Sequence, residues 1–248
     1  MKGKAEVTVI IPAYNAEKYI EKAVDSALGQ SVPVDVMVVD DCSTDATAEL
    51  LKKYINNNEI SYIKNEKNSG VATSRNNAMK LVNTTYIAFL DADDWWVPDK
   101  IEKQLNKIRE VNCVMCSTGR ELVSSAGESL GKYIGVNDEI TYNMLLKTNS
   151  IACSSVLILT EVAKEFYMVH DELHEDYIMW LRVLKKYGIC CGVDEPLLKS
   201  RMSEGGKSRN KVKSAKMQWG VYRFLGVGTF KSLYYMVNYV INGIRKYS

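Results

Sequence analysis

The chain has 248 residues, enough for one large domain, or one domain with an appendage, around a substantial hydrophobic core. Its 46% hydrophobic and 25% charged residues are ordinary for a globular protein and exclude extensive disorder. The chain contains 32 Lys and Arg and 30 Asp and Glu, which gives a formal net charge of +2. A protein that binds nucleic acid usually has a clear excess of positive charge, so we exclude nucleic acid as a partner.

The first hundred residues alternate strand and helix patterns. The apolar and helical periods predict strand 7–11, helix 15–28, strand 34–41, helix 45–55, strand 60–64, helix 71–82 and strand 85–94. Such alternation predicts an α/β fold with right-handed crossovers and a mainly parallel sheet covered by helices on both faces. Pro12 ends the first apolar run too early for a signal peptide, so we expect a cytoplasmic protein.

Polar residues gather where these predicted strands end. They are Pro12 to Asn15 after the first strand, Asp40 and Asp41 after the second, and Asp91 to Asp94 after the fourth. Because ligands of parallel sheets bind outside the carboxyl ends of the strands, we expect one crevice lined by these residues.

The second half is less regular. Its patterns predict a helix at 98–110, a strand at 113–123, a hairpin loop at 124–133 and helices at 138–147, 160–167 and 174–188. The basic segment 199–216 is predicted to be a mobile loop. A final helix begins at Phe230, with one apolar face formed by Leu233, Met236, Val237, Val240, Ile241 and Ile244.

Six cysteines are present, and only Cys113 and Cys116 have the CxxC spacing of a metal site. No second CxxC or HxxxH pair completes a zinc site. We therefore expect buried, reduced thiols.

The segment YIAFLDADDWW crowds Asp91, Asp93 and Asp94 onto one strand end. Carboxylates this close repel one another, so at least one pKa should rise unless a cation or hydrogen-bond donors neutralise the group. An Asp-x-Asp after a buried strand is typical of a hard divalent cation, Mn²⁺ or Mg²⁺, that takes its other ligands from phosphates and water. The alternative is that Asp93 or Asp94 caps the following helical segment.

Two further segments carry candidate groups. In NSGVATSRNNA, Asn68 and Gly70 open a helix that bears Arg75, an arrangement suited to an anionic ligand group, or else an ordinary capped turn. In HEDYIMWLRVL, Glu175 and Asp176 begin a helix, where capping is the default interpretation and a general base beside a metal is the alternative.

Together, the blocks VTVIIPAYNAEKYI, VVDDCSTDAT, NSGVATSRN, IAFLDADDWWVPDKIEKQ and HEDYIMWLR resemble family 2 glycosyltransferases of the GT-A fold. The resemblance implies a catalytic domain at 1–200, with a nucleotide-sugar-binding half at 1–110 and an acceptor-side half at 111–200. Residues 201–248 would add a flexible basic loop and an amphipathic helix. It also implies a nucleotide-sugar donor, usually a uridine diphosphate sugar, a Mg²⁺ or Mn²⁺ ion, and inversion at the anomeric carbon.

Carried over residue by residue, the resemblance assigns a role to each matching position. The implied nucleotide-sugar site contains Pro12, Ala13, Tyr14, Glu17, Asp41, Asn68, Gly70, Arg75, Asp91 and Arg201. Asp41 would accept from the uracil N3–H, Arg75 would lie along the nucleotide, and Arg201 would touch the diphosphate. Asp93 would ligate the metal, with Asp91 at the ribose or a metal-bound water. Cys42 departs from the family, which usually has glycine in that turn.

On the acceptor side, Asp176 would deprotonate the acceptor hydroxyl and Glu175 would support it. Trp95 and Trp96 are candidates to stack on sugars, and a core role for at least one of them is the alternative. The predicted function is sugar transfer to a hydroxyl of a glycan or lipid-linked acceptor in cell-surface polysaccharide synthesis. The alternatives are a noncatalytic binding module on the same scaffold and nucleotidyl transfer, although PAYNAEKY is not the phosphate loop that nucleotidyl transfer requires.

The apolar stripe of the final helix, about eleven residues long, is too short to span a bilayer. Its basic flanks and tyrosines favour peripheral contact with the inner face of the cell membrane. Packing on the catalytic domain, or on a second subunit in a homodimer, is the alternative.

Overall fold

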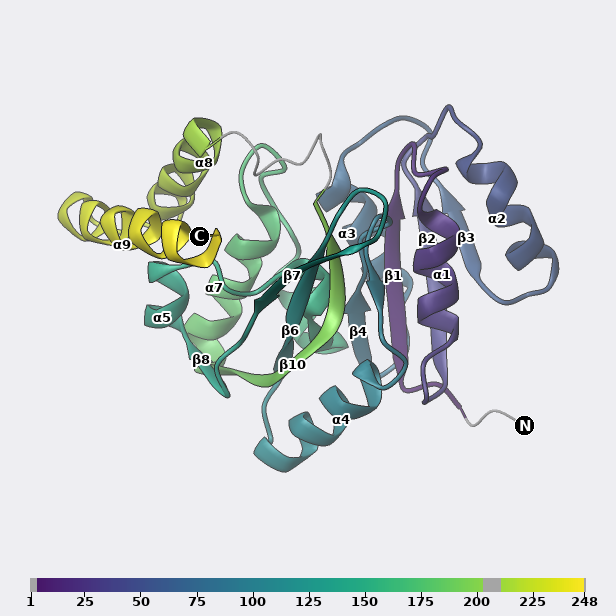
Figure 1. Ribbon diagram of the computed structural model, residues 1–248, viewed down its shortest axis with the longest axis horizontal. Coiled ribbons are helices and arrows are strands. Elements are labelled where there is room, and N and C mark those ends of the chain that lie inside the picture. Colours follow the sequence, from purple (N-terminus) through teal and green to yellow (C-terminus); the bar gives the residue numbers. More distant parts are fainter. Residues whose placement is uncertain (1–3, 203–210, 248) are drawn as a thin grey trace.

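The computed structural model describes residues 4–202 and 211–247, which form a mixed sheet covered by helices (Figure 1). The strands are β1 (Val7–Ala13), β2 (Val34–Asp40), β3 (Ser61–Lys64), β4 (Tyr86–Phe89), β5 (Trp95–Trp96), β6 (Met115–Val123), β7 (Ser129–Ile134), β8 (Glu139–Thr141), β9 (Leu157–Leu159) and β10 (Ile189–Arg201). The helices are α1 (Ile20–Leu28), α2 (Thr47–Asn56), α3 (Val71–Leu81), α4 (Lys100–Val111), α5 (Tyr142–Lys147), α6 (Thr160–Glu165), α7 (Glu175–Tyr187), α8 (Lys211–Phe224) and α9 (Thr229–Tyr247).

The sheet has the order β3-β2-β1-β4-β9-β6-β10-β5, with β7 on β6 and β8 on β10. From β3 to β4 every pairing is parallel, as the alternation of strands and helices predicts. Beyond β4 the sheet is mixed, because β9 lies antiparallel between β4 and β6 while β10 runs parallel to β6. The parallel half therefore places the ends of β1, β2 and β4 at one edge.

Apolar side chains pack on both faces of the sheet. Along β1, Val9 and Ile11 belong to a core shared with α1, α2 and α4. Ile10 points the other way, into a core shared with α3, α6 and α7. Because successive side chains of a strand face opposite sides of the sheet, a continuous apolar run indicates a strand that is buried on both faces.

Two predicted segments differ from the structure, and a third is confirmed. The helix expected at 138–147 is strand β8 followed by the shorter α5. The segment 199–216 is not one mobile loop: it begins in β10 and ends in α8, while residues 203–210 lie outside the described part of the chain. The hairpin predicted at 124–133 is present, and its second strand is β7.

The predicted C-terminal helix is present as α9, which lies with α8 at the end of the molecule opposite α2 and β3 (Figure 1). Its predicted apolar stripe is largely exposed, including Leu233, Val237, Val240 and Ile241. Within the described residues, no helix is both long enough and apolar enough to cross a membrane.

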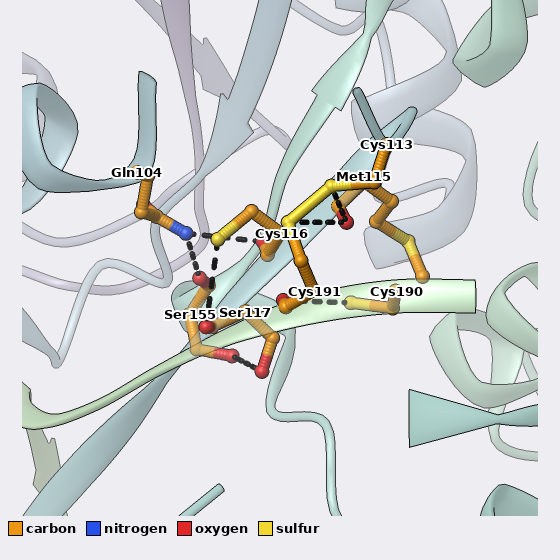
Figure 2. The surroundings of a disulfide bond; sticks show 8 residues. All are labelled: Gln104, Cys113, Met115, Cys116, Ser117, Ser155, Cys190 and Cys191. Carbon is orange, nitrogen blue, oxygen red and sulfur yellow. Dashed lines mark hydrogen bonds between the residues drawn. A yellow bond between two sulfur atoms is a disulfide. The ribbon is translucent and has the colours of Figure 1, made fainter. Parts of the chain in front are cut away.

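The expectation of reduced thiols is wrong for two cysteines, since Cys113 and Cys191 form a disulfide (Figure 2). Cys113 precedes β6, and Cys191 lies on β10, which pairs with β6. This pairing brings Cα atoms 78 positions apart in the chain to 6.4 Å, a separation that a disulfide can bridge. The other four cysteines are free thiols.

Cys42 adopts the left-handed conformation, with φ of 66°, in the turn after β2. A residue with a side chain costs about 1–2 kcal/mol in this conformation, and glycine avoids that cost. Glycine also loses more conformational entropy on folding, which offsets part of the gain. We expect Cys42→Gly to raise the free energy of unfolding by up to about 1 kcal/mol and Cys42→Val to lower it by about 1 kcal/mol or more. Urea denaturation of both variants measures the changes, and a valine variant as stable as the parent would contradict this explanation.

Candidate active site

A cavity of about 250 Å³ opens where the parallel strands end. Its walls come from the loop after β1, the start of α3 and the loop after β4, and consist of Pro12, Tyr14, Asn15, Ala16, Tyr19, Val71, Asp91, Ala92 and Asp93. The fold thus brings predicted site residues from two distant blocks into one crevice, as expected at the carboxyl edge of a parallel sheet.

Three acids follow β4, and two of them, Asp91 and Asp93, line this cavity. Asp94 is buried, and burial followed by repulsion from Asp93 raises the pKa of its carboxyl group well above the usual value. Burial and then repulsion from Asp91 raise the pKa of Asp93 to about 6, against the pull of Arg201. The crowding seen in the sequence therefore has the electrostatic consequence expected of it.

Asp94 and Asp93 have different surroundings. The Asp94 carboxylate accepts from the backbone N–H of Arg201 at 2.8 Å, so it ties the end of β10 to this loop. Asp93 lines the cavity. In the described part of the chain, no group of three or more His, Cys, Asp or Glu side chains is arranged to hold a metal. The carboxylate oxygens of Asp91 and Asp93 at the cavity are the kind of ligand that a hard cation takes, with its other ligands from phosphate and water.

Arg75 is buried, with only 3% of its side chain exposed, between the two groups of acids. Its Nη2 atom lies 2.5 Å from Asp91 Oδ1, and its Nη1 atom lies 3.0 Å from Glu175 Oε1. Arg75 does not line the cavity, and its guanidinium contacts these acids; its expected position along the nucleotide stays a prediction. It joins the loop after β4 to the start of α7.

The first turn of α7 carries Glu175 and Asp176 in different states. Glu175 is buried and ion-paired with Arg75. Burial and then repulsion from Glu175 raise the pKa of Asp176 to about 7, although Arg75 acts in the opposite direction. A carboxylate whose pKa lies near neutrality is well matched to accept a proton from a hydroxyl group.

Asp41 holds the turn that opens α3. Its carboxylate accepts from Asn65 Nδ2 at 2.7 Å, from Ser69 N at 2.9 Å and from Gly70 N at 2.8 Å. Gly70 has φ of 88°, and a Cβ atom there would collide with the carboxylate of Asp171. Asp41 thus has a structural task, and its contact with uracil stays a prediction.

The other residues predicted for the nucleotide site are divided. Pro12 and Tyr14 line the cavity, whereas Ala13 is buried in the core. Glu17 accepts from the backbone N–H of Ala46 at 3.0 Å, so it caps α2. Asn68 is exposed and is not part of the cavity wall.

Asn15 was expected both in the crevice and as the cap of the first helix, whereas Tyr19 was assigned to that helix and was missed as a cavity residue. Asn15 has φ of 49° and accepts from Thr44 N at 2.9 Å, so it shapes a turn instead of capping a helix. Tyr19 precedes α1 and lines the cavity. Their position between the end of β1 and the start of α1 could have indicated that they line the cavity.

Arg201 and the two tryptophans lie beside the acids. The Arg201 guanidinium donates from Nε to the Asp93 carbonyl at 2.9 Å and lies 4.2 Å from the centre of the Tyr19 ring. Trp95 has Lys22 Nζ 3.4 Å from the centre of its ring. Trp96 is 3% exposed and donates to the Ser154 carbonyl at 2.8 Å, so it is a core residue and a role in stacking on sugars is wrong for it.

Removing Arg75 should leave Glu175 buried without its cation. We therefore expect Arg75→Leu to lower the free energy of unfolding by about 3–5 kcal/mol. The control Arg109→Leu removes an exposed ion pair to Glu6 and should cost less than about 1 kcal/mol. Chemical denaturation measures both; equal losses would contradict a special role for the Arg75 ion pairs.

Comparisons with known proteins agree with this fold and identify the family. Residues 8–164 match glycosyl transferase family 2. A Bacillus subtilis (strain 168) protein, named as the teichuronic acid biosynthesis glycosyltransferase TuaG, is 39% identical over 98% of each chain. WfgD of Escherichia coli, named as a UDP-Glc:alpha-D-GlcNAc-diphosphoundecaprenol beta-1,3-glucosyltransferase, is 33% identical over 98% of this chain and 95% of its own.

Solved structures share the fold at lower sequence identity. TarS 1–349 of S. aureus, in complex with UDP-GlcNAc, superimposes with a TM-score of 0.75 at 23% identity, covering 92% of this chain and 66% of that one. The mannosyltransferase PcManGT of Pyrobaculum calidifontis, in complex with GDP-Man and Mn2+, gives 0.69 at 16% identity, covering 90% of this chain and 64% of that one. The family match covers more than half of the chain, and the fold is the GT-A fold of these neighbours. The protein belongs to glycosyl transferase family 2 and is a glycosyltransferase.

Proposed function

We propose that this glycosyltransferase moves a sugar from a uridine diphosphate sugar to a hydroxyl of a lipid-linked glycan, with inversion and with the help of Mn²⁺ or Mg²⁺. The observation that carries the proposal is that Arg75 joins two groups of acids. On one side it pairs with Asp91, next to Asp93 and Asp94 with their raised pKa values, and on the other with Glu175, next to Asp176, whose pKa is about 7. The acids after β4 suit a metal-bound diphosphate, and Asp176 suits an acceptor hydroxyl.

The names of the relatives support the choice of substrates. WfgD is named for transfer from UDP-Glc to a diphosphoundecaprenol-linked sugar, and TuaG for teichuronic acid biosynthesis. TarS binds UDP-GlcNAc, and PcManGT was solved with Mn2+. By analogy, we propose a role in cell-surface polysaccharide synthesis at the cytoplasmic face of the membrane.

On the donor side, Asp93 would hold the cation, with Asp91 beside it. A bound Mn²⁺ or Mg²⁺ supplies charge neutralisation for the departing diphosphate. Arg75 fixes Asp91 through its 2.5 Å contact, and Arg201 adds a positive charge next to Asp93. Arg75 and Arg201 thus orient Asp91 and Asp93, but the pKa of Asp93 remains raised.

On the acceptor side, Asp176 takes the proton of the attacking hydroxyl. The hydroxyl oxygen forms a bond to the anomeric carbon, and the bond from that carbon to the diphosphate breaks with its electron pair leaving on the diphosphate. A single displacement of this kind inverts the anomeric centre. Glu175 stays paired with Arg75 and keeps the pKa of Asp176 high by repulsion. A noncatalytic binding module would have no use for such a base.

We expect Asp93→Ala to abolish the Mn²⁺-dependent part of uridine diphosphate binding and to abolish transfer, because the cation loses its main protein ligand. Isothermal titration with uridine diphosphate, with and without Mn²⁺, measures this. Asp99→Ala is a matched control, since Asp99 pairs with Lys103 on the surface at 2.7 Å. Unchanged metal dependence in the Asp93 variant would rule out this ligand.

We expect Asp176→Asn to lower turnover by about 10²-fold or more while the affinity for uridine diphosphate stays near the parent value. The base works only as a carboxylate, so kcat/KM of the parent should fall about tenfold per pH unit below about 7, where Asp176 becomes protonated. The residual activity of the variant should lack this slope. Loss of nucleotide binding in the variant would instead assign Asp176 to the donor site and make Glu175 the candidate base.

A further inference from the structure

Helix α9 packs on the protein through one face and exposes an apolar outer face. On the inner face Ser232 is fully buried, the Tyr235 ring lies 5.9 Å from that of Tyr222 on α8, and Asn242 donates to the Lys147 carbonyl at 3.3 Å. The outer face consists of Phe230 (90% exposed), Leu233 (53%), Tyr234 (55%), Val237 (59%), Val240 (50%) and Ile241 (44%). The spacing of three and four residues puts these side chains on one stripe.

This outer face belongs to a strongly basic part of the chain. After Gly205 the sequence contains nine Lys and Arg and no Asp or Glu, whereas the residues before it contain 23 Lys and Arg and 30 Asp and Glu. Lys216, Arg223 and Lys231 are exposed on α8 and α9. The net charge of +2 is therefore the sum of a positively charged C-terminal segment and a negatively charged remainder of the chain.

We propose that the outer face of α9 docks on an anionic lipid surface, with the helix lying in the plane of the interface. An exposed apolar stripe with cationic neighbours suits lipid headgroups of negative charge. A symmetric contact with a second copy would place two such basic segments against each other, so charge favours the lipid. No described helix is apolar and long enough to cross the bilayer, which leaves an interfacial position for α9.

The docking surface is connected to the acceptor side of the site. On α8, Gly220 allows close contact with Leu173, because a Cβ atom at Gly220 would lie 2.7 Å from its Cδ2. Gln218 of α8 also donates to the hydroxyl of Tyr177 at 3.2 Å. Leu173 and Tyr177 flank Glu175 and Asp176 in the chain. Docking would thus hold the proposed base near the bilayer, an extension that rests on the proposed lipid-linked acceptor.

The test is sedimentation of the full chain with vesicles, without any sugar donor. We expect binding to vesicles of equal parts phosphatidylglycerol and phosphatidylcholine, and about tenfold weaker binding to phosphatidylcholine alone or in high salt. The double variant Leu233→Asp/Val237→Asp should bind the anionic vesicles about tenfold or more weakly. Lys216→Glu/Lys231→Glu should weaken binding without changing the apolar stripe.

The matched control is Leu81→Asp/Leu130→Asp, which changes two exposed leucines elsewhere by the same charge. Its binding to vesicles should equal that of the parent, and circular dichroism checks that every variant is folded. The proposal is overturned if the α9 variant binds like the parent or if the control loses as much. It is also overturned if the parent ignores vesicles while light scattering detects a dimer that the α9 variant lacks.

Uridine diphosphate binding, measured without vesicles, separates this proposal from the proposed function. The α9 variants should keep it, because the changed side chains do not line the cavity. A protein that binds vesicles through α9 but never binds uridine diphosphate would refute the donor assignment and leave the docking surface standing.

Discussion

The buried ion pairs of Arg75 connect the parts of the site that chemistry needs close together. Asp91 follows β4, and Glu175 begins α7, a hundred positions from Arg75 along the chain. A guanidinium with two fixed directions suits such a bridge better than an ammonium group, since it can address two carboxylates at once. Burial makes the arrangement demanding, because each partner is costly to leave unpaired.

This bridge also divides the acids into satisfied and unsatisfied groups. Asp91 and Glu175 receive the charge of Arg75, whereas Asp93, Asp94 and Asp176 have raised pKa values, chiefly because of burial. Neighbouring carboxyl groups in unlike environments are a common way to obtain one ionised and one protonatable group. This division suits the proposed cation site at Asp93 and the proposed base at Asp176.

The parallel half of the fold was predictable because its signals are local. Val7–Ala13 is a continuous buried run, and the helices after it follow their apolar period. Strand β9 has only three residues, and β10 shifts register between Val193 and Leu198, so neither gives a clear period. Helix α8 was missed because its buried positions include Ser214 and Gln218, which do not form an apolar stripe.

The sequence predicts which polar residues lie at the strand ends, but not which partners their side chains contact. Arg75 was expected beside an anionic ligand, and its pairing with Asp91 and Glu175 depends on segments far away in the sequence. The disulfide between Cys113 and Cys191 likewise depends on the pairing of β6 with β10. Such long-range partners do not follow from spacing in one sequence.

The packing of α8 gives the C-terminal segment a place in the architecture of the site. Its Gln218 reaches Tyr177, the residue next to Asp176, and its Tyr222 donates to the Leu146 carbonyl on α5 at 2.7 Å. Helix α9 in turn packs on α8 and α5 through Tyr235 and Asn242. Side chains of α8 therefore connect α9 to the first turn of α7. The C-terminal segment thus packs against the part of α7 that carries the proposed base, Asp176.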